Sequence, residues 1–464
     1  MTQTAREGNW LSNEDQIMFL AHRYARQEAV IQVIWLYRRP VSMENIEQFY
    51  TNLSKGLLGR RIERCLLPIG RHHWVSVQTA EAAFEMSQTL LPANQLHPWA
   101  DAQIELPLDP EFGPAWRLAA QSFDDGSTCI SLTISHCIAD GVFATLSVID
   151  AVKGVQRDFG YPQLRRRPSW RSFTDDIKIL IGDIPLGIKA LSAISQLLPE
   201  PPYRAIDKIK TISTLRLPWR RATVGSSPIA QSKTCFAPLV SVTLSLEPSH
   251  WDQKARELRA DRLTLLVALA GHLGVVLGRA KGGNLSFVIP VSVHASSDNL
   301  SANQVRLARF RIPVSLLSDD LPQVRRLLKN QLLRIRRAPD SLSALLPLSP
   351  FLPPFIVPLL LKSSLKFATD FPITCSHQGV LPTQVKQIDG GTSDGFWYRG
   401  LDRCVSYENM RRRGGLLTAF SSEVGTTMII TIVSFQVGAE NNRSRLISLV
   451  NDTLEAFQLT ATIL

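Results

Sequence analysis

Several local signatures of metal-binding, disulfide-bonded and secreted proteins are missing from this 464-residue sequence. No two of its cysteines form a CxxC pair, which argues against a zinc site or a disulfide framework and suits a reducing compartment. The polar N-terminus, MTQTAREGNWLSNEDQ, has no signal-peptide core. We therefore expect a cytoplasmic protein that holds no metal.

A long uninterrupted hydrophobic run is also missing. The most apolar stretch, residues 342–366, is broken by five prolines, and the segments between them are too short to span a bilayer as a helix. We interpret this stretch first as core or as the wall of an acyl channel. The second interpretation is a surface that contacts membrane lipid, which would place the protein at the membrane surface.

Acidic residues are outnumbered by basic ones, 40 to 51, and the formal net charge is +11. Basic runs occur at 165–167, 325–326, 336–337 and 411–413. A solvated basic surface explains them most simply. The alternatives are attraction to an acidic carrier protein, to a phosphate-bearing thioester cofactor or to an anionic membrane. Zinc fingers, aromatic RNA-binding motifs and basic repeats are absent, so we expect no nucleic-acid partner.

The chain is longer than one hydrophobic core supports, which favours two lobes. In the first half the patterns predict helices at 12–25, 42–55 and 142–153 and strands at 29–39, 74–78, 115–123 and 127–135, the last two forming a hairpin. In the second half they predict strands at 241–248, 284–295 and 426–436 and helices at 250–279, 320–338 and 443–457. We predict an α/β (α+β) fold with a mixed-sheet sandwich in each lobe. The expected divisions are an N-terminal lobe (1–175), a crossover with helix near 174–198 (176–238) and a C-terminal lobe (239–464).

The stretch SLTISHCIADGV (131–142) places His136, Asp140 and Gly141 on a loop between a predicted strand and a predicted helix. A zinc half-site would need further ligands, and no HExxH motif is present. Activation of the flanking Ser135 or Cys137 is disfavoured, because neighbouring residues of an extended chain point in opposite directions. Considered alone, His136 is either a structural residue at a strand end or a catalytic base.

The HxxxDG spacing resembles the signature of the chloramphenicol-acetyltransferase-like superfamily. Its members include nonribosomal-peptide condensation domains, plant CoA-dependent acyltransferases, bacterial wax ester synthases and polyketide-associated acyltransferases. The resemblance extends over nearly the whole chain: LLGRRIERC (57–65) resembles an arginine-bearing helix end, residues 290–304 a second-lobe segment, and PITCSHQGVLP (372–382) a Ser-Asn-x-Gly strand and loop. It implies two such lobes with an active-site tunnel between them.

By this resemblance His136 is the general base that takes the proton of an acceptor as the acceptor attacks an acyl thioester. Imidazole suits this task because its ordinary pKa lies near neutral pH. Asp140 is expected to shape the loop and to pair with an arginine, and Gly141 to permit a tight turn and close substrate approach. Ser376 is a candidate for binding the oxyanion or the thioester. The candidate arginine partners are Arg60, Arg61 and Arg306.

The sequence departs from the family pattern at several positions. Ser135 stands where many relatives have a first histidine. His294 and His377 stand where arginine and asparagine are common, which bears on the electrostatics of the tunnel or on the choice of acceptor. Residues 394–397 (DGFW) only loosely resemble the DFGW loop of the plant branch, and we expect a surface loop there.

The resemblance implies an O-acyltransferase whose donor is acyl-CoA or a phosphopantetheine-linked acyl carrier protein. No permanently bound cofactor is expected, and the hydroxyl acceptor is lipid-like or polyketide-like. The alternatives are a non-catalytic protein that docks an acyl carrier and an amide-forming condensation enzyme. We expect a monomer, with peripheral contact to a membrane as a further candidate interaction.

Overall fold

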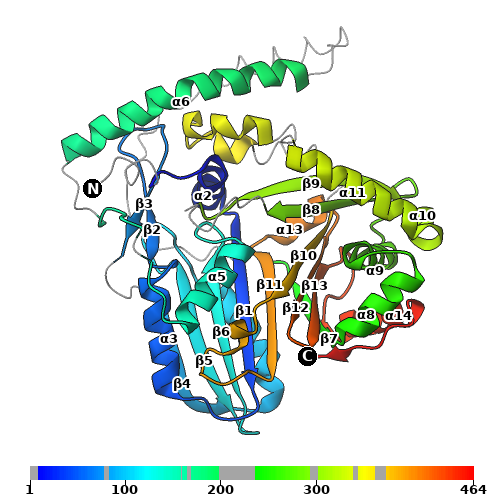
Figure 1. The fold of residues 1–464 in the computed structure, drawn as a ribbon. Coiled ribbons are helices and arrows are strands. Elements are labelled where there is room, and N and C mark those ends of the chain that lie inside the picture. The colour runs from blue at the N-terminus through cyan, green and yellow to red at the C-terminus, as the bar shows by residue number, and fades with distance from the viewer. Residues whose placement is uncertain are drawn as a thin grey trace.

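The computed structural model describes residues 9–77, 83–157, 159–164, 169–197, 236–292, 301–337, 343–360 and 372–464. Its strands form two large mixed sheets with helices packed against them, and one small sheet (Figure 1). This arrangement confirms the predicted two-lobed α/β class. The domain boundaries at 175 and 238 remain predictions.

The first sheet has the strand order β11-β1-β6-β5-β4. Four of its strands come from the first half of the chain: β1 (Glu28–Tyr37), β4 (Ala83–Leu91), β5 (Trp116–Phe123) and β6 (Thr128–Ser135). The first half also forms helices α2 (Asn13–Ala25), α3 (Met43–Lys55), η1 (Ala93–Gln95), α4 (Leu96–Glu105) and α5 (Gly141–Val152). The predicted β5–β6 hairpin is confirmed, and every residue of β6 is buried. The HxxxDG loop therefore starts from a fully buried central strand.

The second sheet has the strand order β14-β7-β13-β12-β10-β8-β9. Its strands are β7 (Val240–Leu246), β8 (Asn284–Ser292), β9 (Val305–Pro313), β10 (Ile373–Leu381), β12 (Leu416–Val424), β13 (Thr427–Phe435) and β14 (Thr462–Ile463). Its helices are α8 (Pro248–Glu257), α9 (Arg262–Val276), α10 (Val314–Asp319), α11 (Leu321–Arg337), α13 (Tyr407–Arg413) and α14 (Arg443–Ala456). β10 pairs in parallel with both β8 and β12, whereas β12 and β13 are antiparallel.

The single helix predicted at 250–279 is wrong, because two helices, α8 and α9, occupy this range. Arg259 has a φ of 51°, in the left-handed region, which ends the first helix. The carboxylate of Asp261 then accepts a hydrogen bond from the backbone N–H of Thr264 and caps the second.

The helix end predicted at 57–65 is also wrong. α3 ends at Lys55, and Gly56 follows it as the C-cap residue. Residues Arg60–Glu63 form β2, which pairs with β3 (His73–Ser76) as a small antiparallel sheet. Arg60 and Arg61 therefore lie on a strand, where both are buried.

The expected surface loop at 394–397 is wrong as well. Gly395–Arg403 form β11, which pairs antiparallel with β1 at the edge of the first sheet. Phe396 and Trp397 are each only 4% exposed and belong to the core of the first lobe. A strand from the second half of the chain thus completes the first sheet, beside the strand that precedes α3 (Figure 1).

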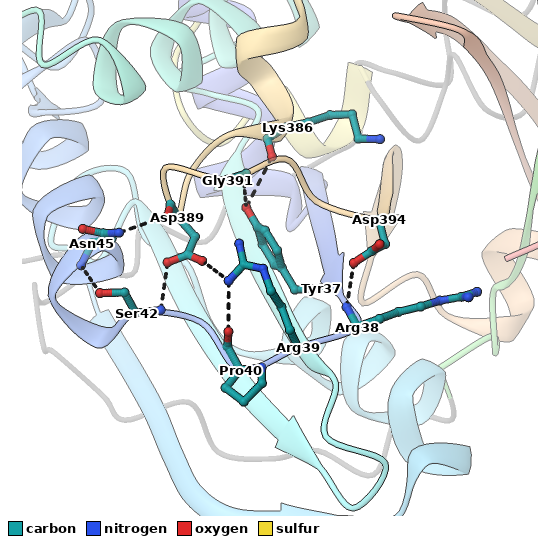
Figure 2. A network of polar contacts seen from close by, with 10 residues as sticks. All are labelled: Tyr37, Arg38, Arg39, Pro40, Ser42, Asn45, Lys386, Asp389, Gly391 and Asp394. Carbon is teal, nitrogen blue, oxygen red and sulfur yellow. Dashed lines mark hydrogen bonds and ion pairs between the residues drawn. The ribbon is translucent and has the colours of Figure 1, made fainter.

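Polar contacts hold the connection between β10 and β11 against the first lobe (Figure 2). The carboxylate of Asp389 accepts hydrogen bonds from the backbone N–H of Ser42 at 2.8 Å and from the Arg39 guanidinium at 2.6 Å. Asp394 accepts from the backbone N–H of Arg38 at 2.7 Å. The Tyr37 hydroxyl donates to backbone carbonyls of the same connection. The two halves of the chain are therefore joined by hydrogen bonds as well as by the shared sheet.

The apolar stretch at 342–366 is described up to residue 360. Its 3-10 helix η2 (Ser343–Phe351) packs against α2 and against the long helix α6 (Ser169–Leu197). None of residues 343–360 belongs to either of the two main hydrophobic clusters. Ser349, Pro350 and Val357 are nevertheless buried, and Leu352 and Pro354 line a cavity described below, so the interpretation as core or channel wall stays a prediction.

Candidate functional site

The HxxxDG residues occupy the loop between β6 and α5, as predicted. The backbone N–H of His136 donates to the carbonyl of Ala29, which precedes Val30 on the neighbouring strand β1, at 2.9 Å. Asp140 is the N-cap of α5, and its Oδ1 accepts from the backbone N–H of Phe143 at 2.8 Å. The loop is thus fixed at one end by the sheet and at the other by a helix cap.

The imidazole of His136 makes no hydrogen bond with any described residue. Its Nδ1 is buried without a partner, and the residue as a whole is half-buried. Nε2 is not among these buried unpartnered atoms. A buried polar atom left unpaired costs free energy, and catalytic sites are one place where proteins retain such atoms.

A segment of the second half of the chain, residues 302–304, contacts the motif loop directly. The backbone N–H of Asp140 donates to the carbonyl of Ala302 at 2.8 Å. Asp140 Oδ2 accepts from the backbone N–H of Gln304 at 3.3 Å. Asp140 therefore caps its own helix and also binds a segment far away in the sequence, which agrees with a loop-shaping role.

Asp15 on α2 holds the other side of the same segment. Its carboxylate accepts from the backbone N–H groups of Ala302 (3.0 Å) and Asn303 (2.8 Å) and from the Asn303 side-chain amide (3.0 Å). The same amide donates to the backbone carbonyl of His136 at 3.0 Å. Asp15 and Asn303 thus position the backbone of the candidate base. Burial raises the pKa of Asp15 to about 6, against the opposing effects of Asn303 and Arg60.

Arg60 lies under the motif loop. It is 1% exposed, donates to the carbonyl of Ile138 at 2.9 Å, and stacks on the rings of Trp74 and Phe143. Its guanidinium therefore supports both the loop and the first turn of α5.

The two other candidate arginines have contacts of their own. Arg61 is buried, and its guanidinium fills the space that a side chain at Gly113 would occupy. Arg306 donates to the carbonyls of Ile335 and Arg336 at the end of α11. A helix end with free carbonyls is a favourable partner for a guanidinium.

Gly141 is the first residue of α5, and its backbone is outside the left-handed region. The expected tight turn is therefore not the reason for glycine. A Cβ built on Gly141 would lie 2.3 Å from Nε2 of Gln378 on β10. The glycine makes room for a side chain from the second lobe.

The strand that supplies Gln378 also carries Ser376 and His377. Its pairing with β12 shifts between His377 and Val380, so Gln378 lies at an irregularity. Ser376 is half-buried and makes no side-chain hydrogen bond with a described residue. His377 Nδ1 lies 2.8 Å from the hydroxyl of Ser421, and burial lowers its pKa. His294 lies outside the described residues.

Two cavities lie near these elements. A small apolar one of about 20 Å³ is lined by Gly141 and Thr145 of α5, Ile31 and Val33 of β1, and Tyr398 of β11, among others. A larger one of about 610 Å³ lies between α2, the β2–β3 connection and residues 352–354. The small cavity thus touches Gly141 of the motif, and its lining includes Val385, Phe396 and Tyr398 from the second half of the chain.

A GxSxG pattern, typical of a nucleophile elbow, occurs at 391–395 (GTSDG). Ser393 is 1% exposed, and the stretch leads into β11. An elbow requires a turn from a strand into a helix, which is not present here. This serine is therefore no candidate nucleophile.

Sequence reasoning missed three residues at the site: Asp15, Asn303 and Gln378. The local sequence marks Asp15 only as a partner of the N-cap Ser12, whose hydroxyl does accept from the Asp15 backbone N–H at 3.0 Å. Its carboxylate, however, bonds residues almost 290 positions away. No local pattern carries that information.

No protein-family model matches the chain, and no curated protein matches it. Solved structures with the same fold do match. The first condensation domain of the CDA synthetase is 12% identical, with a TM-score of 0.57 over 98% of this chain and 99% of that one. The condensation domain of the Monacolin K polyketide synthase MokA is 11% identical, with a TM-score of 0.54 over 98% of both.

A third match is the wax ester synthase/diacylglycerol acyltransferase from Marinobacter aquaeolei VT8. It is 14% identical, with a TM-score of 0.53 over 97% of this chain and 98% of that one. These alignments span both lobes, so the likeness concerns the whole architecture. The chain has the two-lobed fold that condensation domains and this acyltransferase share, as the HxxxDG resemblance implies.

Proposed function

We propose that the protein transfers an acyl group from a thioester to a hydroxyl acceptor, with His136 as the general base. Nε2 of His136 takes the proton of the acceptor hydroxyl while the oxygen attacks the thioester carbonyl. The tetrahedral intermediate collapses, the C–S bond breaks, and the leaving thiolate takes the proton back from the imidazolium. The products are an ester and a free thiol.

The observation that carries this proposal is the state of His136. Its backbone is held on both sides, by Ala29 through the N–H and by Asn303 through the carbonyl. Its ring has no hydrogen-bond partner among the described residues. A rigid backbone with an unengaged imidazole is what a base for an incoming substrate requires. A purely structural histidine is expected to use its ring nitrogens.

The second lobe supplies the remaining parts of the proposed site. Ser376 lies on β10, the strand that reaches the motif through Gln378, and its hydroxyl bonds no described residue, so we assign it to the oxyanion or the thioester. The donor is acyl-CoA or an acyl carrier protein, and the basic charge of the chain suits the phosphates of either one. The apolar cavity beside α5, at about 20 Å³, has room for no more than a methyl-sized group of the acceptor or the donor.

Release of thiol from a panel of acyl-CoA and carrier-bound donors, with alcohols and amines as acceptors, tests the proposal. We expect ester formation, and a loss of at least ~100-fold in His136→Ala, which is the usual contribution of a general base. His250→Ala is the matched control, because His250 is exposed on α8. Equal rates for His136→Ala and wild type would disprove the assignment of the base.

The same panel separates the two alternatives. Turnover with amines but not with alcohols would identify an amide-forming condensation enzyme. Absence of turnover, together with binding of a carrier protein, would identify a docking protein.

A further inference from the structure

We propose that α6 is a membrane-docking helix that binds the surface of an anionic lipid bilayer. This inference goes beyond the proposed reaction and is tested without it. No helix among the described residues is long and apolar enough to cross a membrane. Any membrane contact of these residues must therefore be made from the surface.

The helix lies at the outer edge of the molecule, beyond η2 and outside both sheets (Figure 1). Two buried carboxylates fix its inner side. Asp183 forms a two-pronged ion pair with Arg71, at 2.8 and 3.1 Å. Asp176 accepts from the backbone N–H of Leu66 at 2.6 Å. Gly187 lies so close to the ring of Phe351 that a Cβ there would be 2.7 Å away. The orientation of α6 about its axis is thus determined.

Large apolar side chains follow one another on a different side of the helix. They are separated by three, four or eight residues, which places them in a single stripe. Trp170 is 65% exposed, Ile181 60% and Ile188 62%. The segment after η2 adds further exposed apolar side chains. The stripe consists of Trp170, Phe173, Ile181, Ile184, Ile188 and Leu191, and the segment adds Phe355, Leu359 and Leu360.

The charges of α6 specify the kind of surface that covers the stripe. All its basic residues, Arg171, Lys178 and Lys189, are exposed, and their spacings of seven and eleven residues put them on one side. Two of its three acidic residues are the buried ones described above, and the third, Asp175, lies 4.0 Å from Lys178. An apolar stripe bordered by cations is typical of helices that lie in the interface of an anionic membrane.

A bilayer fits this pattern better than a protein groove. The stripe extends along nearly the entire described helix without an acidic side chain. In the proposed orientation the apolar side chains enter the acyl region, while the basic side chains reach the phosphates. The +11 charge of the chain adds long-range attraction to the same surface.

Flotation of the full chain with vesicles tests the proposal. We expect binding to vesicles of phosphatidylcholine mixed with phosphatidylglycerol, weaker binding to phosphatidylcholine alone, and weakening by salt. Ile181→Asp with Ile188→Asp should reduce partitioning at least ~10-fold, because each isoleucine buries substantial apolar area in lipid. Lys178→Glu with Lys189→Glu should remove the preference for the anionic vesicles.

The matched controls lie on α11, an amphipathic helix that is basic, unlike α6, whose three basic and three acidic residues balance. Leu333 is exposed there, as are Arg326 and Lys329. Leu333→Asp should leave vesicle binding unchanged, and the pair Arg326→Glu and Lys329→Glu should weaken it only through the lower net charge, less than Lys178→Glu with Lys189→Glu does. Thermal unfolding confirms that every variant is folded.

Three outcomes would overturn the proposal. One is no binding to either kind of vesicle, and another is binding lost in the α11 variants but retained in the α6 variants. The third is a dimer that the α6 variants convert to a monomer, which would mean that a second copy covers the stripe. Thiol release with a water-soluble acceptor should be unchanged in the α6 variants, so failure of membrane binding is distinguishable from failure of the proposed reaction.

Discussion

Two buried aspartates bind the same short segment, residues 302–304: Asp140 from within the HxxxDG loop and Asp15 from α2. Asp140 also caps α5, three residues along the chain. The carboxylate of Asp15 has a local contact with the Ser12 side chain, but it also receives three N–H groups from Ala302 and Asn303. The cap made by Asp140 can be predicted from its local sequence, whereas the N–H groups that the Asp15 carboxylate receives lie almost 290 residues away.

The two aspartates therefore have different structural roles at the site. Asp140 shapes the loop on which the candidate base lies, while Asp15 acts through Asn303 on the backbone carbonyl of His136. Both aspartates act together with residues 302–304 of the second half of the chain, so the geometry of His136 depends on the docking of the second half against the first. Substitutions of the two aspartates should therefore lower the free energy of unfolding by different amounts and with a different dependence on pH.

The largest loss in the free energy of unfolding is expected from Asp140→Ala. It removes the cap of α5 and leaves the N–H of Gln304 without its acceptor, which together should lower the free energy of unfolding by about 2–4 kcal/mol. Ser406→Ala is the control for a cap alone, since Ser406 caps α13 through the N–H of Asn409. It should cost about 1 kcal/mol. Urea unfolding measures both.

Asp140→Asn sharpens this prediction, because asparagine retains the ability to cap a helix. We expect it to lose stability and acyl transfer together, as a loop-shaping residue should. A variant with wild-type unfolding and no transfer would instead place Asp140 in the chemistry.

A smaller loss in the free energy of unfolding, one that depends on pH, is expected from Asp15→Asn. The pKa of Asp15 in the folded protein is about 6, above its ordinary value of 3.8. The folded state therefore binds more protons than the unfolded state between these values, and the contribution of this group to stability falls as pH rises from about 4 to about 6. Asparagine does not titrate, so the stability advantage of wild type over the variant should shrink over that range.

Urea unfolding of both proteins at several pH values between 4 and 7 measures this advantage. An advantage that grows with pH would contradict the prediction, because it would mean that the N–H donors and Arg60 stabilise the charged carboxylate more than burial penalises it. The variant also places an amide group against the N–H of Ala302, so a cost of about 1–3 kcal/mol at acidic pH is expected.

The sequence alone predicts the local half of this site. The strand, the loop with His136 and Asp140, and the helix that follows are neighbours in the chain, so apolar patterning and the HxxxDG spacing are sufficient. Asn303 and Gln378 reach the loop only after the second lobe has docked. The same holds for β11, whose first residues resemble a loop in sequence because their partner, β1, lies more than 350 residues earlier. Pairing over such distances leaves no periodic signal.

The smallest change in the free energy of unfolding is expected from Gly141→Ala. This substitution tests a third contact between the two halves of the chain, that of Gly141 with Gln378. The new Cβ would meet Nε2 of Gln378 at 2.3 Å, but that atom is the end of a flexible side chain and can move. Alanine also favours the helix by up to about 1 kcal/mol, which offsets the displacement. We expect stability within about 0.5 kcal/mol of wild type and a clear loss of acyl transfer, because Gln378 is pushed away from the motif.

Gly182→Ala is the matched control, since Gly182 lies on α6 and a Cβ there meets no atom within 4 Å. It should stabilise α6 slightly and leave transfer unchanged. Gln378→Ala, alone and combined with Gly141→Ala, completes a double-mutant cycle. If the loss of transfer caused by Gly141→Ala disappears when Gln378 is already alanine, glycine is needed at position 141 because it leaves space for the Gln378 side chain. If the loss persists, the space beside Gly141 serves the substrate and not the side chain of Gln378.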